Sequence, residues 1–149
     1  TYDLKPEMSA QGVLDAALAS VTKKQHDLII VNFANPDMVG HTGDIDAAIK
    51  AVETVDSAVG RLAEAVSVAG AAMLVTADHG NCEVMWDPTA NSPHTAHTTN
   101  PVPCILVNHM KDAPAQDLQN GSLVDLAPTL LDLLGIDQPD EMTGRSLII

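Results

Sequence analysis

Five side chains of types that bind transition metals follow apolar segments of this sequence. Two short polar clusters each pair a carboxylate with an imidazole, and a third imidazole comes soon afterwards. The five candidate ligands are Asp37, His41, Asp78, His79 and His97. Imidazole together with carboxylate favours manganese, zinc, cobalt or iron, whereas calcium prefers all-oxygen sites. The residue types therefore predict a divalent transition-metal site.

The number of candidates leaves two arrangements open. Five ligands exceed the three that one catalytic metal needs from a protein, yet they fall short of two complete shells. Either one metal binds, or two bind and part of a shell lies outside this sequence. His94 lies three residues before His97 and competes for the same role, although a solvated or hydrogen-bonded side chain is the simpler interpretation of His94. Asp78, taken alone, is equally suited to capping a turn.

Apolar periodicity predicts the elements that must position these side chains. A helical period near 3.6 residues runs through 9–24, 44–69 and 123–134. The segment 44–69 has the clearest pattern, with Asp44 favourable at the positive helix start and Gly70 providing the stop.

Short apolar runs predict strands between these helices. They cover 28–33, 71–75 and 103–107, with a further short strand at 145–149, and 79–101 is expected to be a long loop. A strand, a long helix and a second strand indicate a right-handed parallel crossover. We therefore predict an α/β fold with a largely parallel sheet and helices on both faces.

This arrangement predicts where the candidate ligands meet. Parallel strands end at the same edge of a sheet, and ligands bind beyond those carboxyl ends. Neighbouring strands are about 5 Å apart, so the two acid–imidazole pairs should lie close together. The return of His97 to the same edge is a separate inference, because His97 belongs to the loop that leads to the next strand.

Composition limits the class of protein. The chain has 149 residues, which fits one domain, and a net charge of −13. Such an acidic surface repels phosphate backbones, so no nucleic-acid partner is expected. No apolar run is long enough to cross a membrane and no signal peptide is visible, so we expect no membrane partner. Cys82 and Cys104 form no CxxC motif and fit a reducing cytoplasm.

Three stretches of the chain resemble a known enzyme family. Residues 32–41 (NFANPDMVGH), 76–81 (TADHGN) and 97–103 (HTTNPVP) are similar to cofactor-independent phosphoglycerate mutase, a member of the alkaline phosphatase superfamily. Residues 1–10 and 126–131 also resemble this family, so the likeness covers nearly the whole chain. The DHG element is shared across the wider superfamily, whereas the run at 32–41 is much more specific to the mutase.

The resemblance implies a function and a site. These enzymes interconvert 3-phosphoglycerate and 2-phosphoglycerate in glycolysis, using two manganese ions and a transiently phosphorylated serine. By motif position Asp37, His41 and His97 would hold one manganese, and Asp78 and His79 would belong to the other. The implied fold is a three-layer α/β/α, alkaline-phosphatase-like domain, and the implied protein is cytoplasmic and monomeric.

The resemblance also implies that the chain is incomplete. Thr1 is not an initiator methionine, and the family's chain is several times longer. We expect residues 1–149 to be the C-terminal part of the metal-binding phosphatase-type domain, with the serine segment and the transferase domain absent. The piece alone is then expected to be inactive and to self-associate through exposed apolar surface.

Two other readings remain open from the sequence. One is another phosphatase or a phosphopentomutase of the same superfamily. The other is a non-catalytic metal-binding or structural module.

Overall fold

The structure, a computed structural model, describes residues 1–111 and 116–149, which form two compact units. The first unit, called unit 1 below, comprises residues 1–65 and 79–102. Unit 2 comprises residues 66–78 and 103–149. The chain therefore leaves unit 1 and returns to it later.

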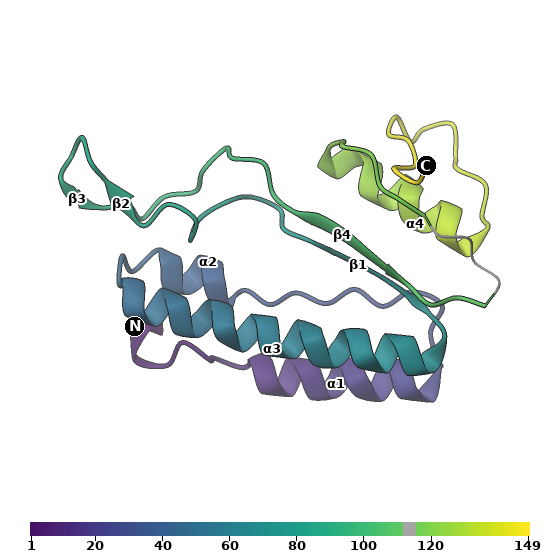
Figure 1. Ribbon diagram of the computed structural model, residues 1–149, viewed down its shortest axis with the longest axis horizontal. Coiled ribbons are helices and arrows are strands. Elements are labelled where there is room, and N and C mark those ends of the chain that lie inside the picture. Colours follow the sequence, from purple (N-terminus) through teal and green to yellow (C-terminus); the bar gives the residue numbers. More distant parts are fainter. Residues whose placement is uncertain (112–115) are drawn as a thin grey trace. The chain divides into compact units, whose positions relative to one another are not determined.

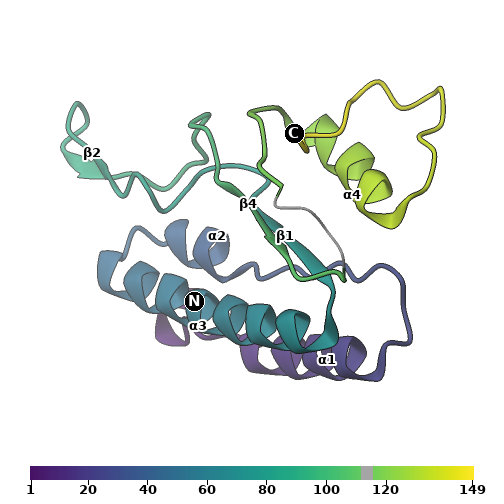
Figure 2. The same ribbon diagram turned by 45° about the vertical axis from the view of Figure 1, so that its right-hand side comes forward.

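Two helices in unit 1 match the helical patterns of the sequence. Helix α1 spans Ala10–Lys23 and α3 spans Ile45–Ala69, with its last turn in unit 2. Within unit 1 the two helices run side by side (Figures 1 and 2). The Asp44 carboxylate accepts a hydrogen bond of 2.9 Å from the Ala47 amide, and Gly70 ends the helix at φ +67°. A positive φ is tolerated best by glycine, so the predicted stop is confirmed.

Between these helices the structure corrects one predicted element. Residues 28–33 form no strand, and Leu28 and Ile30 are 48% and 83% exposed. A strand requires a partner backbone to accept and donate its hydrogen bonds, and no described segment pairs with this one. An apolar run therefore forms a buried strand only when such a partner is present.

A short helix that the sequence analysis did not predict follows this segment. Helix α2 spans Asn35–Gly40, with Pro36 in its first turn, where the missing amide hydrogen costs nothing. A three-residue 3-10 helix, η1 (Tyr2–Leu4), contacts α2. The buried Asn35 side chain donates a 2.8 Å hydrogen bond to the Pro6 carbonyl and ties the start of α2 to the N-terminal segment.

The core beneath α2 is built from small aliphatic side chains. Val39 is fully buried against three alanines of α3, and partly buried sulfur-bearing side chains complete the cluster. The members are Val39, Ala47, Ala48 and Ala51, with Met8, Cys82 and Met85 around them. Alanine on the α3 side leaves room for α2 to approach closely, and this packing holds α2 in place.

The long loop predicted at 79–101 contains only short extended pieces. Strands β2 (Trp86–Asp87) and β3 (Ser92–Pro93) form a small antiparallel hairpin. A single bridge joins Gly80 to Thr98, and the Thr98 amide donates a 2.9 Å hydrogen bond to the Gly80 carbonyl. This bridge draws the two ends of the loop together.

Unit 2 contains a two-stranded antiparallel sheet. Strand β1 (Ala72–Thr76) pairs with β4 (Cys104–Asn108), with Leu74 opposite Leu106. Both strands match the sequence prediction to within a residue. The pairing is antiparallel because the intervening loop leaves from the end of β1 and returns to that same end, where Thr76 lies opposite Cys104.

The predicted C-terminal helix is also present in unit 2. It begins as a 3-10 turn, η2 (Leu123–Asp125), and continues as α4 (Leu126–Leu134), which Gly135 ends at φ +65°. The predicted strand at 145–149 is reduced to an isolated bridge between Leu118 and Ile148. Because only one residue pair is bridged, the segment 145–149 does not form a continuous strand.

The incomplete α/β class is confirmed, while the parallel pairing is not found among residues 1–111 and 116–149, whose two sheets are both antiparallel. In the same residues no helix is long and apolar enough to cross a bilayer.

Candidate metal centre

Asp37, in the first turn of α2, lies at the centre of a cluster of nitrogen atoms in unit 1. The Asn81 side-chain amide donates a hydrogen bond of 2.8 Å to Oδ1 of this carboxylate. His97 Nε2 and His41 Nε2 lie 3.0 and 3.2 Å from the same oxygen. Three nitrogen atoms from three segments of the chain therefore converge on one carboxylate oxygen.

The surroundings of Asp37 favour its charged form. Partial burial is the largest single influence and raises the pKa of the carboxyl group. The hydrogen bond from Asn81 and the nearby imidazoles outweigh burial together, so the pKa lies below the ordinary value of 3.8. Asp37 therefore offers a full negative charge to a cation at neutral pH.

His41 lies one helical turn after Asp37 and has a defined orientation. Its Nδ1 is 2.7 Å from the Thr95 carbonyl oxygen. A carbonyl can only accept, so Nδ1 carries the hydrogen, and Nε2 of the neutral ring presents its lone pair. A second hydrogen bond of this kind is the usual support of a metal-binding histidine.

The spacing of the three atoms fits a divalent metal. His41 Nε2 and His97 Nε2 are 3.0 Å apart, and their distances to Asp37 Oδ1 are 3.2 and 3.0 Å. Metal bonds of about 2.1 Å place neighbouring ligand atoms roughly 3.0 Å apart in an octahedral shell and roughly 3.4 Å apart in a tetrahedral one. The observed triangle lies within this range, so one cation can contact all three atoms.

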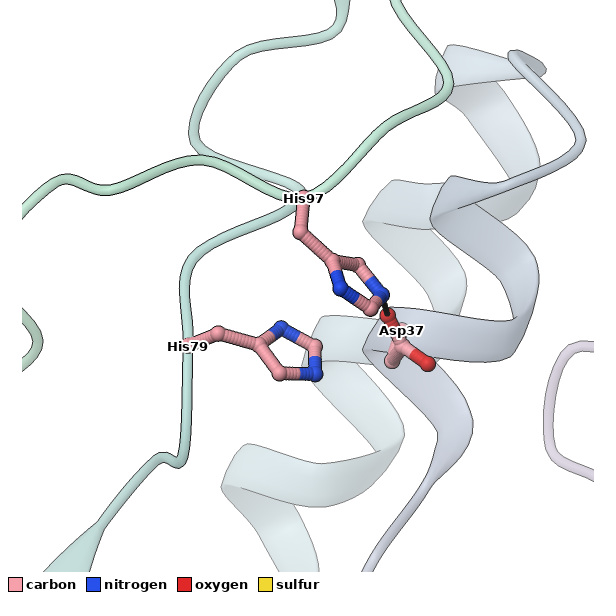
Figure 3. Close-up of side chains that lie close together, drawn as sticks. All are labelled: Asp37, His79 and His97. Carbon is pink, nitrogen blue, oxygen red and sulfur yellow. Dashed lines mark ion pairs between the residues drawn. The ribbon is translucent and has the colours of Figure 1, made fainter.

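His79 approaches the same cluster from the loop after β1. Its ring stacks on His97, with centroids 3.7 Å apart and planes 20° from parallel. Ligand atoms of His79, His97 and Asp37 lie within 4.8 Å of one another (Figure 3). His79 therefore borders the triangle and extends the set of nitrogen ligands.

Four of the five predicted ligands are thus brought together in unit 1. The fifth, Asp78, is the last residue of the segment 66–78, which belongs to unit 2, and its side chain is exposed. Its role as a ligand stays a prediction.

The rival histidine and the nearby cysteine take other positions. His94 is not part of the metal-type cluster, and its Nδ1 is buried without a hydrogen-bond partner among the described residues. The Cys82 thiol donates a 2.8 Å hydrogen bond to the Pro36 carbonyl. Burial above all, with the negative charges of Asp37 and Glu83, raises the pKa of this thiol, so it remains protonated and structural.

Two residues next to the histidines have contacts that the sequence analysis did not anticipate. Asn81 is buried and holds Asp37 through both its carboxylate and its backbone carbonyl. Glu83 accepts hydrogen bonds from Asn81, Thr98 and Asn100. Asn81 ends the stretch 76–81 that carries part of the resemblance, and Glu83 follows two residues later, but neither position says anything about tertiary partners.

Comparison with known proteins identifies the class. The family described as the Metalloenzyme superfamily matches residues 1–138, and the chain belongs to this superfamily. Among curated proteins it is similar to 2,3-bisphosphoglycerate-independent phosphoglycerate mutases. The chain is 62% identical to those of Syntrophotalea carbinolica and Cereibacter sphaeroides over 148 residues, which is 99% of this chain and 28% of each relative.

A solved structure shows the same likeness in three dimensions. The phosphoglycerate mutase of Leishmania mexicana, crystallised at low cobalt concentration, superposes with a TM-score of 0.89 at 32% identity. The match covers 99% of this chain and 29% of that one. The chain therefore spans less than a third of the length of the relatives it matches.

Proposed function

We propose that this chain provides most of the metal site of a 2,3-bisphosphoglycerate-independent phosphoglycerate mutase, an isomerase that interconverts 3-phosphoglycerate and 2-phosphoglycerate. The observation that carries the proposal is the triangle formed by Asp37 Oδ1, His41 Nε2 and His97 Nε2. The likeness to mutases over 99% of the chain supports the choice of reaction.

The proposed ligand sets follow the two halves of the cluster. Asp37, His41 and His97 hold one manganese ion, and Asp78 and His79 contribute to a second. The ligand types suit manganese, and they also suit the cobalt named for the Leishmania mexicana crystals. The remaining ligands of the second ion, the serine nucleophile and the substrate-binding groups belong to the part of the relatives' length that this chain does not span.

The chain's own residues prepare the site in three ways. Asp37 supplies negative charge, and Asn81 fixes the direction of its carboxylate. The Thr95 carbonyl keeps the His41 hydrogen on Nδ1, so that Nε2 is available to a cation. When bound, the metals neutralise charge on the phosphoryl group and lower the pKa of the nucleophile.

The cellular setting follows from the same proposal. The mutase acts in glycolysis in the cytoplasm, on a small-molecule phosphoglycerate, as a monomer when complete. Residues 1–149 alone have no mutase activity and self-associate.

Manganese titration of the chain 1–149 tests the metal site. Calorimetry and manganese EPR should detect binding by the unaltered chain and its loss in Asp37→Ala and His41→Ala. His26→Ala is the matched control, since it removes an exposed imidazole of unit 1 from outside the cluster. Equal affinity in the unaltered chain and in Asp37→Ala would reject the site.

A coupled assay of the complete polypeptide tests the reaction. We expect manganese-dependent conversion of 3-phosphoglycerate to 2-phosphoglycerate that is abolished by His41→Ala. Hydrolysis of phosphate esters without mutase turnover would instead identify a phosphatase.

A further inference from the structure

The carboxylate of Glu83, four residues after His79, accepts hydrogen bonds from three groups. Its Oε2 accepts the Asn81 amide hydrogen at 2.7 Å. Its Oε1 accepts the Thr98 hydroxyl hydrogen and, at 3.1 Å, a hydrogen of the Asn100 side-chain amide. One side chain therefore joins two segments that are more than ten residues apart.

Those two segments carry two of the candidate ligands. Asn81 lies two residues after His79, and Thr98 directly follows His97. The Gly80–Thr98 backbone bridge joins the same segments beside the carboxylate. The stacked His79 and His97 rings thus belong to two bridged segments that Glu83 holds together.

The environment requires a group that only accepts hydrogen bonds. All three partners donate, and an ionised carboxylate has no hydrogen to oppose them. The hydrogen bond from Thr98 is the largest influence on Glu83 and lowers the pKa of its carboxyl group, so the charge is present at neutral pH. A glutamine would keep one accepting oxygen and turn an NH₂ group toward a donor.

The backbone at Gly80 lies very close to the Glu83 and Thr98 side chains. A Cβ atom at position 80 would collide with both the Glu83 carboxylate and the Thr98 hydroxyl. The hydrogen bond between Glu83 and Thr98 therefore depends on the absence of a side chain at Gly80, the residue next to His79.

We propose that Glu83 is a positioning residue that holds His79 against His97 by clamping the loop of each to the other. The inference rests on the proposed metal site and concerns a residue that does not contact the metal. Outer residues that orient metal ligands typically change metal affinity by about tenfold to a hundredfold when they are replaced.

Metal binding by Glu83→Gln tests this role, with Glu64→Gln on the exposed surface of α3 as the matched control. Glu83→Gln should keep the helical circular dichroism of the unaltered chain, lose about tenfold or more in manganese affinity, and change the ligand-field spectrum of bound cobalt. Glu64→Gln should match the unaltered chain in all three. Thr98→Val should lose manganese affinity as Glu83→Gln does. Thr98→Ser should keep the affinity of the unaltered chain, because its hydroxyl can still donate to Glu83.

A measurement without metal separates this inference from the proposed function. In the unaltered chain, NMR should detect nuclear Overhauser contacts between the His79 and His97 rings, and Glu83→Gln should lose them. Unchanged ring contacts, or unchanged manganese affinity and cobalt spectrum, would overturn the role of Glu83 while the metal site stands. Absence of metal binding by the unaltered chain would reject the proposed function, and the ring contacts would still decide the role of Glu83.

Discussion

Asp37 combines three properties at one atom. Its Oδ1 is charged, held by an amide hydrogen and faced by two imidazole nitrogens about 3 Å away. In the neutral ring of His41 the hydrogen is on Nδ1, so Nε2 and Asp37 Oδ1 both present lone pairs that a cation placed between them would satisfy. The charge of Asp37 should therefore matter more than its shape.

Replacing Asp37 with asparagine tests the importance of charge. Asp37→Asn keeps the size of the side chain and removes the charge, so we expect manganese affinity to fall at least about tenfold. Isothermal titration calorimetry measures the change. Asp46→Asn removes an exposed carboxyl of unit 1 and should leave the affinity unaltered, whereas a retained affinity in Asp37→Asn would contradict the assigned role.

At the scale of single residues, the sequence predicted which side chains lie close together better than it predicted the residues that support them. Asp37, His41, His79 and His97 were recognisable because few side-chain types bind metals and because the resemblance placed them. Asn81 and Glu83 are common polar types. Their importance comes from contacts with distant residues: Asp37 lies 44 positions from Asn81, and Thr98 lies 15 positions from Glu83. Local sequence does not contain such contacts.

At the scale of elements, α3 depends on its N-terminal cap. Asp44→Ala removes the acceptor of the Ala47 amide and should lower the free energy of unfolding by about 1 kcal/mol. Urea unfolding followed by circular dichroism measures this loss. Asp56→Ala removes the same side chain from the exposed middle of α3 and should change stability by less than about 0.5 kcal/mol; equal effects would show that the cap is not important.

The start of α4 should respond to acid through Asp125. Its carboxylate accepts hydrogen bonds from the Ser122 and Arg145 amides, the Ser122 bond being the largest influence, and these lower the pKa of Asp125. A lowered folded-state pKa stabilises the fold above the ordinary value of 3.8, and this contribution is lost as the pH falls below that value toward the folded-state pKa.

Urea midpoints on either side of that pH test the role of Asp125. Between pH 5 and pH 3, the unaltered chain should lose more stability than Asp125→Asn, which has no carboxyl group to protonate at this position. Asp140→Asn changes an exposed carboxyl of unit 2 and should follow the unaltered chain. Parallel pH profiles for Asp125→Asn and the unaltered chain would contradict the prediction.

Helices were predicted more successfully than sheet pairing. The patterns of α1, α3 and α4 are local, so their 3.6-residue period could be recognised directly, as could the glycines that end α3 and α4. The segment 28–33 and the C-terminal segment 145–149 have strand-like composition, but a strand depends on a distant partner. Helix α2 was missed because six residues are too few to show a period.

At the scale of the whole molecule, the chain should be catalytically silent alone. It spans 28% of the length of the Syntrophotalea carbinolica relative. A coupled enzymatic assay of purified residues 1–149 with manganese should detect no conversion of 3-phosphoglycerate. Robust turnover would show that the nucleophile lies within this sequence.

Exposed apolar surface should also make the isolated chain self-associate. Ile45, Ile49 and Trp86 line one groove of unit 1 and are 59%, 50% and 52% exposed. Light scattering should give an apparent mass that rises with concentration. Ile49→Lys should reduce the rise, while Lys50→Arg, a neighbouring change that preserves polarity, should not; a constant monomer mass would contradict the prediction.

The interrupted path of unit 1 has a consequence for biosynthesis. Translation delivers every ligand-bearing segment by residue 97, and the last residue of unit 1 follows at 102. Strand β1 is synthesised before that point, whereas its pairing partner β4 is complete only at residue 108. When residue 102 has left the ribosomal exit tunnel, every candidate ligand of unit 1 would therefore be outside it, while β1 would still lack its pairing partner.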